Sequence, residues 1–209
     1  PYITIDGQPT VEVDYCTLNP TIVYALCSAD AGNADLYERV LDRPLSPEER
    51  QIVKRAFNAM LMAGKRLTHA PDGIYPSVLG LKWCELRDLI IKAHQPIAHM
   101  FFTGIGLSLQ YEDSRLAENI MLHFANNGIP VLPIHDSFLI FHSLADELEE
   151  LMCRLFFEQF GKHISTKRVP MIEQPSFVSE EYSQWSDRNE RWLRTNRINY
   201  DIDNIIITR

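Results

Sequence analysis

The sequence predicts a mixed α/β (α+β) domain in which an antiparallel sheet is backed by helices. Two pairs of short strand-like segments, one at the start of the chain and one within residues 130–142, are each joined by a turn. The stretches between and after these pairs carry helical periodicity and helix-start signals. Strands joined by tight turns pair in antiparallel fashion, and we expect the helices to cover the sheet that they form.

The first strand pair is predicted from residues 2–5 and 11–15. Asp6 and Gly7 lie between these segments and are typical turn residues, so the two segments should form a β-hairpin. The second strand alternates apolar and polar residues and brings Asp14 to its end. A carboxylate is therefore expected at the edge of the sheet.

The helices that follow are predicted from their periodicity and their start signals. We expect one helix from about Asn19 to Ser28 and a short one from Leu36 to Leu41. Ser46 is followed by a proline and, three positions on, by Glu49, which is the pattern of a capping box with proline in the first turn. A longer helix is predicted from Pro47 to about Ala63.

The middle of the chain is predicted to hold a loop and two further helices. Residues 69–80 are rich in Pro and Gly and should form a loop. Residues 81–102 have helical periodicity, with a break or kink at their internal proline. The next helix is expected over residues 115–127, capped by Asp113 and its neighbouring serine and closed by Gly128 in a left-handed conformation.

The second strand pair is predicted over residues 130–134 and 137–142, followed by a helix over 146–160. Asp136 lies between these two apolar strands, where its desolvation costs several kcal/mol unless a cation meets it. Its natural partner is Asp14, the other acid at a strand end. Two such carboxylates could converge on a pair of divalent ions, the arrangement that two-metal phosphoryl transfer requires.

Composition limits the class of protein. A chain of 209 residues with 45% hydrophobic content can bury one good core. Its formal charge of -8 argues against a protein that is basic overall, and four cysteines without a C-x-x-C pair indicate reduced thiols. With no signal peptide and no long apolar run, we expect a soluble cytoplasmic protein with no membrane partner. Because the first residue is Pro and not Met, we also expect sequence upstream of it.

Three polar side chains should form a stripe along the helix that begins at Pro47. Arg50, Lys54 and Asn58 are spaced at i, i+4 and i+8 and so lie on one face. A triphosphate could lie along this stripe, because Arg pairs with phosphate oxygens in a bidentate way and Lys as a point charge. The alternative, for a helix taken alone, is a solvated basic face.

Taken together, three motifs resemble those of family A DNA polymerases and of the related single-subunit phage and mitochondrial RNA polymerases. Asp14-Tyr15 after an apolar strand resembles their first carboxylate motif. Arg50-x-x-x-Lys54 is similar to the nucleotide-binding helix of their fingers, and residues 134–138 resemble their second carboxylate motif. The serine after the second Asp is closer to the RNA polymerase form. The motifs occur in the family's order, and the resemblance covers roughly residues 1–150.

The resemblance implies a metal site in a polymerase-type palm. Asp14 and Asp136 would be the catalytic acids and would hold two Mg²⁺ ions, for which Mn²⁺ can substitute. The backbone carbonyl of Tyr15 would be a further ligand. One ion would activate the attacking 3′-hydroxyl, and the other would neutralise the triphosphate and the leaving pyrophosphate.

The resemblance also implies sites for nucleotide and nucleic acid. Arg50, Lys54 and Asn58 on the fingers helix would bind the nucleoside triphosphate, together with the tyrosine that follows the first acid. His135 would contact the backbone at the primer end, and Gln110 would reach the minor groove near the primer terminus. The implied partners are therefore primer, template and nucleoside triphosphates.

The chain also departs from the family pattern. Met62 stands where the fingers helix of these families carries a Tyr, and Asn19 stands where the DNA enzymes have a Glu that blocks a ribose 2′-hydroxyl. The fingers are reduced to an insertion at about residues 44–110 within a single domain spanning 1–209. No thumb is recognisable, so a further segment or a partner subunit would have to supply one.

The sequence therefore predicts a nucleotidyltransferase that carries out template-directed nucleotidyl transfer, with DNA synthesis favoured. An RNA polymerase and a terminal transferase are the alternatives among enzymes. A different alternative is a degenerate polymerase fold that binds nucleic acid without catalysis, which the short fingers, the missing Tyr and the acidic charge all permit. The presence of both acids favours catalysis, because a buried carboxylate with neither metal nor partner would only lower stability.

Overall fold

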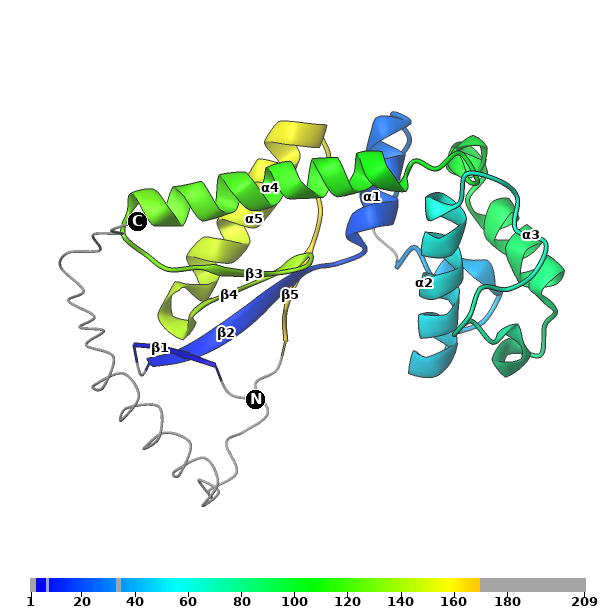
Figure 1. Cartoon of the computed structure of the whole chain (residues 1–209), viewed down its shortest axis with the longest axis horizontal. Helices are drawn as coiled ribbons and strands as arrows, with labels where there is room; N and C mark the ends of the chain where they lie inside the picture. Colours follow the sequence, from blue (N-terminus) through cyan, green and yellow to red (C-terminus); the bar gives the residue numbers. More distant parts are fainter. Residues whose placement is uncertain (1–2, 7, 33–34, 170–209) are drawn as a thin grey trace, which may run out of the picture. The chain divides into compact units, whose positions relative to one another are not determined.

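The computed structural model describes residues 3–6, 8–32 and 35–169, which belong to one compact unit (Figure 1). The terminal segment with its arginines, from residue 170 onward, lies outside the described residues. In chain order the elements are β1 (Thr4–Ile5), β2 (Gln8–Tyr15), α1 (Leu18–Leu26), η1 (Glu38–Val40), α2 (Pro47–Met62), η2 (Pro76–Leu79), α3 (Trp83–Ala93), η3 (Gln95–Met100), α4 (Gly106–Asn126), β3 (Leu132–Ile134), β4 (Ser137–Phe141), η4 (His142–Leu144), α5 (Ala145–Phe160) and β5 (Thr166–Val169).

The sheet is antiparallel and is organised around β2. On one side β2 pairs with β4, which in turn pairs with β3. On the other side β1 pairs with the start of β2 and β5 with its end. The predicted hairpin and the second strand pair are both present, and β5 adds a strand that sequence patterns did not indicate.

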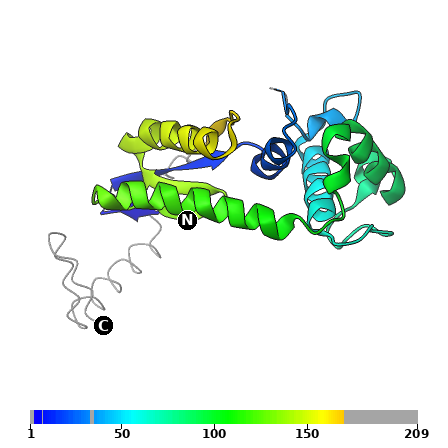
Figure 2. The same ribbon diagram turned by 90° about the horizontal axis from the view of Figure 1, so that it is seen from above.

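One face of the sheet is covered by α4 and α5, which lie side by side (Figures 1 and 2). Val11 pairs with Ile140 and Val13 with Phe138, and all four side chains are buried. Tyr15 points the same way, because its hydroxyl donates a hydrogen bond of 2.9 Å to the carbonyl of Met152 in α5. Alternation along β2 therefore directs Asp14 to the opposite face.

The helical segment between β2 and α4 begins with the predicted capping box. The Ser46 hydroxyl accepts a hydrogen bond from the Glu49 backbone N–H, and the Glu49 carboxylate accepts one from the Ser46 backbone N–H. The other end of α2 is capped by tertiary contacts: the backbone N–H of Phe102 donates to the carbonyl of Met60 at 2.8 Å, and that of Gly104 to Ala63 at 2.9 Å. These bonds satisfy carbonyls that a free helix end leaves unpaired.

A close approach of backbones joins this segment to α4. A Cβ added to Gly106 would lie 3.1 Å from the Cα of Met62 and would collide with its sulfur. A side chain at this position would require Met62 to shift, and glycine avoids that shift. The helix α4 therefore starts against the end of α2 and runs from there across the sheet (Figure 1).

Most predicted elements are confirmed, and α4 is the main correction. It begins at Gly106 and not near Arg115, so Asp113 lies inside the helix and does not cap it. The residues before Asp113 contain neither proline nor a further glycine, and nothing there interrupts the helix. The predicted break at Pro96 is confirmed, since α3 ends at Ala93 and a 3₁₀ helix follows. The expected helix at 36–41 is one 3₁₀ turn, Glu38–Val40.

None of the helices in the described part of the chain is both long enough and apolar enough to cross a membrane.

A buried histidine lies among aromatic side chains in the helical segment. His94 is fully buried, its Nδ1 is hydrogen bonded to the Tyr24 hydroxyl at 3.0 Å, and its ring contacts Phe57 edge-on. Burial, with a smaller effect of Arg39, lowers the pKa of His94 from 6.5 to about 4. The imidazole is therefore neutral in the folded protein at physiological pH.

We predict that this histidine makes folding sensitive to acid. Because the folded pKa of about 4 lies below the unfolded value of 6.5, the unfolded chain binds the extra proton between these pH values, and stability falls as pH drops through them. The loss attributable to His94 should be roughly 3 kcal/mol. Urea unfolding of wild type and His94→Gln from pH 7.5 to 4 measures it. The variant should lose less stability on acidification; equal losses would contradict the assignment.

Candidate functional site

Asp14 lies at the centre of the candidate site, near the end of β2. Register pairs it with Ser137 of β4 on one side and with Lys167 of β5 on the other, so all three side chains lie on the same face of the sheet. The Lys167 ammonium is 2.9 Å from a carboxylate oxygen of Asp14. The Ser137 hydroxyl donates a hydrogen bond of 2.7 Å to Glu12, two residues before Asp14. A cation and two acids thus line this end of the sheet.

Asp136 lies beside Asp14 because the turn from β3 to β4 carries it there. His135 and Asp136 are the two central residues of that turn, and His135 has a φ of 55°. A positive φ at the first central position is typical of the two-residue turns whose twist suits an antiparallel hairpin. The backbone N–H of Tyr15 donates to the carbonyl of Asp136 at 3.3 Å, which ties the turn to the end of β2. The two predicted catalytic acids are therefore on adjacent strand ends.

A third acid, Asp113, approaches this turn from α4. Burial raises the pKa of its carboxyl to about 6, the negative charge of Asp136 raises it further, and His135 partly opposes both effects. Gln110 is exposed one turn earlier on the same side of α4. The helix α4 thus brings both Asp113 and the predicted nucleic-acid residue Gln110 toward the His135–Asp136 turn.

A cleft of about 600 Å³ opens beside Asp14. One wall is formed by the ends of β2 and β5 and the loop before β5, and the other by α2 and the segment before it. Lys54 lines the cleft and forms no ion pair with any described residue. The lining residues are Asp14, Tyr15, Cys16, Thr17, Thr21, Ala31, Gly32, Asp35, Leu36, Tyr37, Arg50, Lys54, His163, Ile164, Ser165 and Lys167.

Arg50 also lines the cleft, but its guanidinium is already paired. Its Nη2 lies 2.6 Å and its Nε 2.7 Å from one carboxylate oxygen of Asp35. The same guanidinium stacks over the Tyr37 ring at 5.2 Å from the centroid. Burial raises the pKa of the Tyr37 hydroxyl, and neighbouring Arg50 and Asn58 partly offset that rise. Arg50 therefore ties α2 to the segment at residues 35–37.

The remaining predicted residues are divided between the cleft and the core. Tyr15 lines the cleft while its buried side chain faces α5. Asn58 lies beside Tyr37 with its carbonyl oxygen buried, and it is not part of the cleft wall. The i, i+4, i+8 stripe thus contributes Arg50 and Lys54 to the cleft but not its third member.

The donors at the two strand ends fit a hard divalent cation. Two carboxylates and a backbone carbonyl are the oxygen ligands that Mg²⁺ prefers. Burial is the main cause of the raised pKa of Asp113, and the nearby negative charge of Asp136 adds to it. No cluster of three or more His, Cys, Asp or Glu side chains suited to a metal occurs within the described residues. The carboxylates of Asp14 and Asp136 and the Tyr15 carbonyl therefore remain the metal ligands that the sequence predicts.

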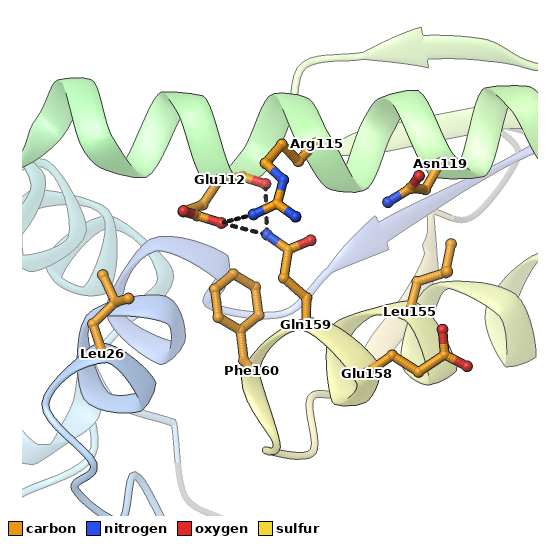
Figure 3. A pocket seen from close by; sticks show the side chains of 8 residues that line it. All are labelled: Leu26, Glu112, Arg115, Asn119, Leu155, Glu158, Gln159 and Phe160. Atoms are coloured by element: carbon orange, nitrogen blue, oxygen red, sulfur yellow. Dashed lines mark hydrogen bonds and ion pairs between the residues drawn. The ribbon is translucent and has the colours of Figure 1, made fainter.

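A second cavity of about 400 Å³ lies between α4 and α5 and next to the end of α1 (Figure 3). Gln159 donates a hydrogen bond to the Glu112 carboxylate, which also accepts one of 3.4 Å from Arg115. Leu26 and Phe160 add apolar wall. Because these polar groups pair with one another across the two helices, the contacts contribute to helix packing.

The fold is similar to a solved polymerase domain. The POL domain of Pol1 from M. smegmatis, in complex with DNA primer-template and dNTP, aligns with a TM-score of 0.51 and 12% sequence identity. The alignment covers 79% of this chain and 40% of that chain. The fold is polymerase-like. No protein-family model and no curated protein matches the sequence.

Two groups of the site escaped prediction from sequence. Lys167 lies on β5, a four-residue strand with two adjacent cations and no alternation of apolar residues. The first and last residues of this strand, Thr166 and Val169, are β-branched, which was the one available sign of a strand. Asp113 was expected to cap a helix, and only the true start of α4 places it near Asp136.

We predict that ionised Asp113 lowers stability at neutral pH. Its folded pKa of about 6 exceeds the unfolded value of 3.8, so the charged form costs stability above pH 6, and the cost disappears as pH falls through that value. Asp113→Asn should therefore stabilise the protein at pH 8 by about 1 kcal/mol, after discounting for partial solvent screening. The gain should vanish near pH 4.

Thermal melts of wild type and Asp113→Asn at pH 8, 6 and 4 measure this effect. Glu118→Gln, an exposed acid on the same helix, is the control and should change stability little at any pH. A variant that is destabilised at pH 8 would show that Asp113 is held by a stabilising partner.

Proposed function

We propose that this protein is a nucleotidyltransferase that extends nucleic acid by template-directed, DNA polymerase-like chemistry. The observation that carries the proposal is the pair of acids at adjacent strand ends, Asp14 and Asp136. Asp14 lines a cleft whose other wall carries Arg50 and Lys54, whereas Asp136 is not among the lining residues. The polymerase-like fold supports the proposal. Phosphoryl transfer of this kind needs clustered carboxylates facing cations that hold the phosphates.

In this proposal Asp14, Asp136 and the Tyr15 carbonyl hold two Mg²⁺ ions, or Mn²⁺ in their place. When bound, these ions activate a 3′-hydroxyl and neutralise charge on the triphosphate. Lys54 binds phosphate oxygens from across the cleft, and Arg50 orders the wall beside it. The carboxylates orient their ligands because the β2–β4 pairing fixes both strand ends.

The nucleic-acid contacts in this proposal come from the turn and from α4. His135 is exposed at the tip of the β3–β4 turn, where it is accessible to a primer backbone. Gln110 is exposed on α4 on the side that carries Asp113. Because the match covers only 40% of the Pol1 chain, we propose that a further segment or a partner subunit supplies a thumb.

A noncatalytic nucleic-acid-binding subunit is the second candidate. The observation that favours it is that two of the key groups are neutralised internally: Asp14 pairs with Lys167, and Arg50 with Asp35. An RNA polymerase or a terminal transferase is the alternative among enzymes. Incorporation of ribo- and deoxyribonucleotides on primed and unprimed templates separates these activities.

We predict that Asp136→Asn abolishes Mg²⁺-dependent nucleotide incorporation without unfolding the protein. Loss of one metal ligand removes the chemistry, and loss of its charge relieves the repulsion felt by Asp113, so the melting temperature should be equal or higher. Incorporation is measured on primed and unprimed templates with both ribo- and deoxyribonucleotides. Asp72→Asn, an exposed loop change outside the cleft, should retain full activity.

If wild type and Asp136→Asn were equally inactive on every substrate, yet bound nucleic acid equally well, the noncatalytic role would replace the enzymatic one. The assay should include any residues that precede Pro1 in the natural protein.

We also predict that Lys54→Met weakens binding of a nucleoside triphosphate by about tenfold, as expected for the loss of one charge-assisted hydrogen bond. The measurement is titration with a fluorescent nucleoside triphosphate in the presence of Ca²⁺. Lys92→Met, which removes an exposed lysine of α3 outside the cleft, should bind as wild type does. Equal affinities for the Lys54 variant and wild type would show that Lys54 is only a solvated residue on the helix surface.

A further inference from the structure

Lys167 forms a solvent-exposed ion pair with Asp14. Its strand position is fixed by the β2–β5 pairing, and its ammonium lies 2.9 Å from the Asp14 carboxylate. Yet 58% of its side chain is exposed, against 20% for Asp14. An ion pair with this much exposure adds little stability, so exchange of partners costs little.

The cleft beside Lys167 could hold a ligand that replaces Asp14 as the partner of its ammonium. Arg50, a cation of the opposite wall, is held by Asp35 and stacked on Tyr37, and is therefore not free to move toward a ligand. Lys54 is the other cation of that wall. Lys167 lines the same cleft on a flexible four-carbon stem with three rotatable donors. Like any lysine side chain in contact with solvent, it carries a positive charge at physiological pH.

We propose that Lys167 is an exchangeable counter-ion that neutralises Asp14 in the free protein and binds a phosphate oxygen of the nucleoside triphosphate once a divalent cation occupies the Asp14 carboxylate. This inference rests on the proposed function and deepens it. In this arrangement Lys54 and Lys167 grip the phosphates from opposite walls of the cleft, and Arg50 positions the wall beside Lys54.

The exchange has consequences of opposite sign for two ligands. A divalent cation must displace the ammonium from Asp14, so removing Lys167 favours the cation. A triphosphate gains a charge-assisted hydrogen bond from the released ammonium, so removing Lys167 disfavours the nucleotide. A residue that only stabilised the strand would weaken both ligands or neither.

The test compares the full chain with its Lys167→Met variant. Mn²⁺ binding, followed by electron paramagnetic resonance without nucleotide, should be several-fold tighter in the variant, because an ammonium no longer competes for the carboxylate. Binding of dATP with saturating Ca²⁺, followed by calorimetry, should be about tenfold weaker. Lys167→Arg, which keeps the charge, should restore most of the dATP affinity.

Lys162→Met is the matched control, because it removes one positive charge next to the cleft but outside its wall. It should leave both affinities within about twofold of wild type, since a screened charge outside the wall contributes little. Thermal melting checks that each variant is folded, and Lys167→Gln repeats the test with a polar side chain of similar length.

The outcomes separate this inference from the proposed function. If wild type binds dATP and Lys167→Met binds both ligands as wild type does, the role of Lys167 is overturned and the proposed function stands. Weaker dATP binding without tighter Mn²⁺ binding overturns the exchange with Asp14. If wild type binds no dATP under these conditions, both proposals fail together.

Discussion

The antiparallel pairing of β2 with β4 is the constraint on which the rest of the site depends. It places Asp14 opposite Ser137, so the turn residue before Ser137, Asp136, must lie at the end of β2. The period of a strand is two residues, and a slip of one would send Asp14 into the apolar layer under α5 and expose Val13. Burial of Val11, Val13, Phe138 and Ile140 against the helices therefore fixes the position of the acids. Core packing and site geometry are set by the same register.

Two charged groups of this site are neutralised by ion pairs: Lys167 compensates Asp14, and Asp35 compensates Arg50. Asp136, by contrast, lies near a second carboxyl, Asp113, whose pKa is raised. An acidic protein can bind phosphate groups only where its cations gather locally, and the cleft collects Arg50, Lys54 and Lys167. Arg50 and Lys167 are held in place by their ion pairs, which use part of their free charge, so a ligand can displace one partner of such a pair.

The fold similarity and the local chemistry support the proposed function in different ways. The likeness to the POL domain of Pol1 from M. smegmatis concerns backbone arrangement, at 12% identity. Fold alone does not determine activity, because one architecture can carry many sites. The functional argument comes from the two acids and the cations that face them.

The sequence alone determined the local elements and the identity of the acids. The capping box at Ser46, the break at Pro96 and the turn at His135–Asp136 depend on neighbouring residues only, and each is present in the structure. The start of α4 was mispredicted: the helix begins at Gly106 because no residue before Asp113 interrupts it. The contact of Gly106 with Met62 is one that no local pattern reveals. Tertiary structure alone decided that Arg50 is engaged by Asp35, that Asn58 lies outside the cleft and that Lys167 meets Asp14. These contacts join residues far apart in the chain, and their pairing depends on sheet register and helix packing, which local sequence preferences do not encode.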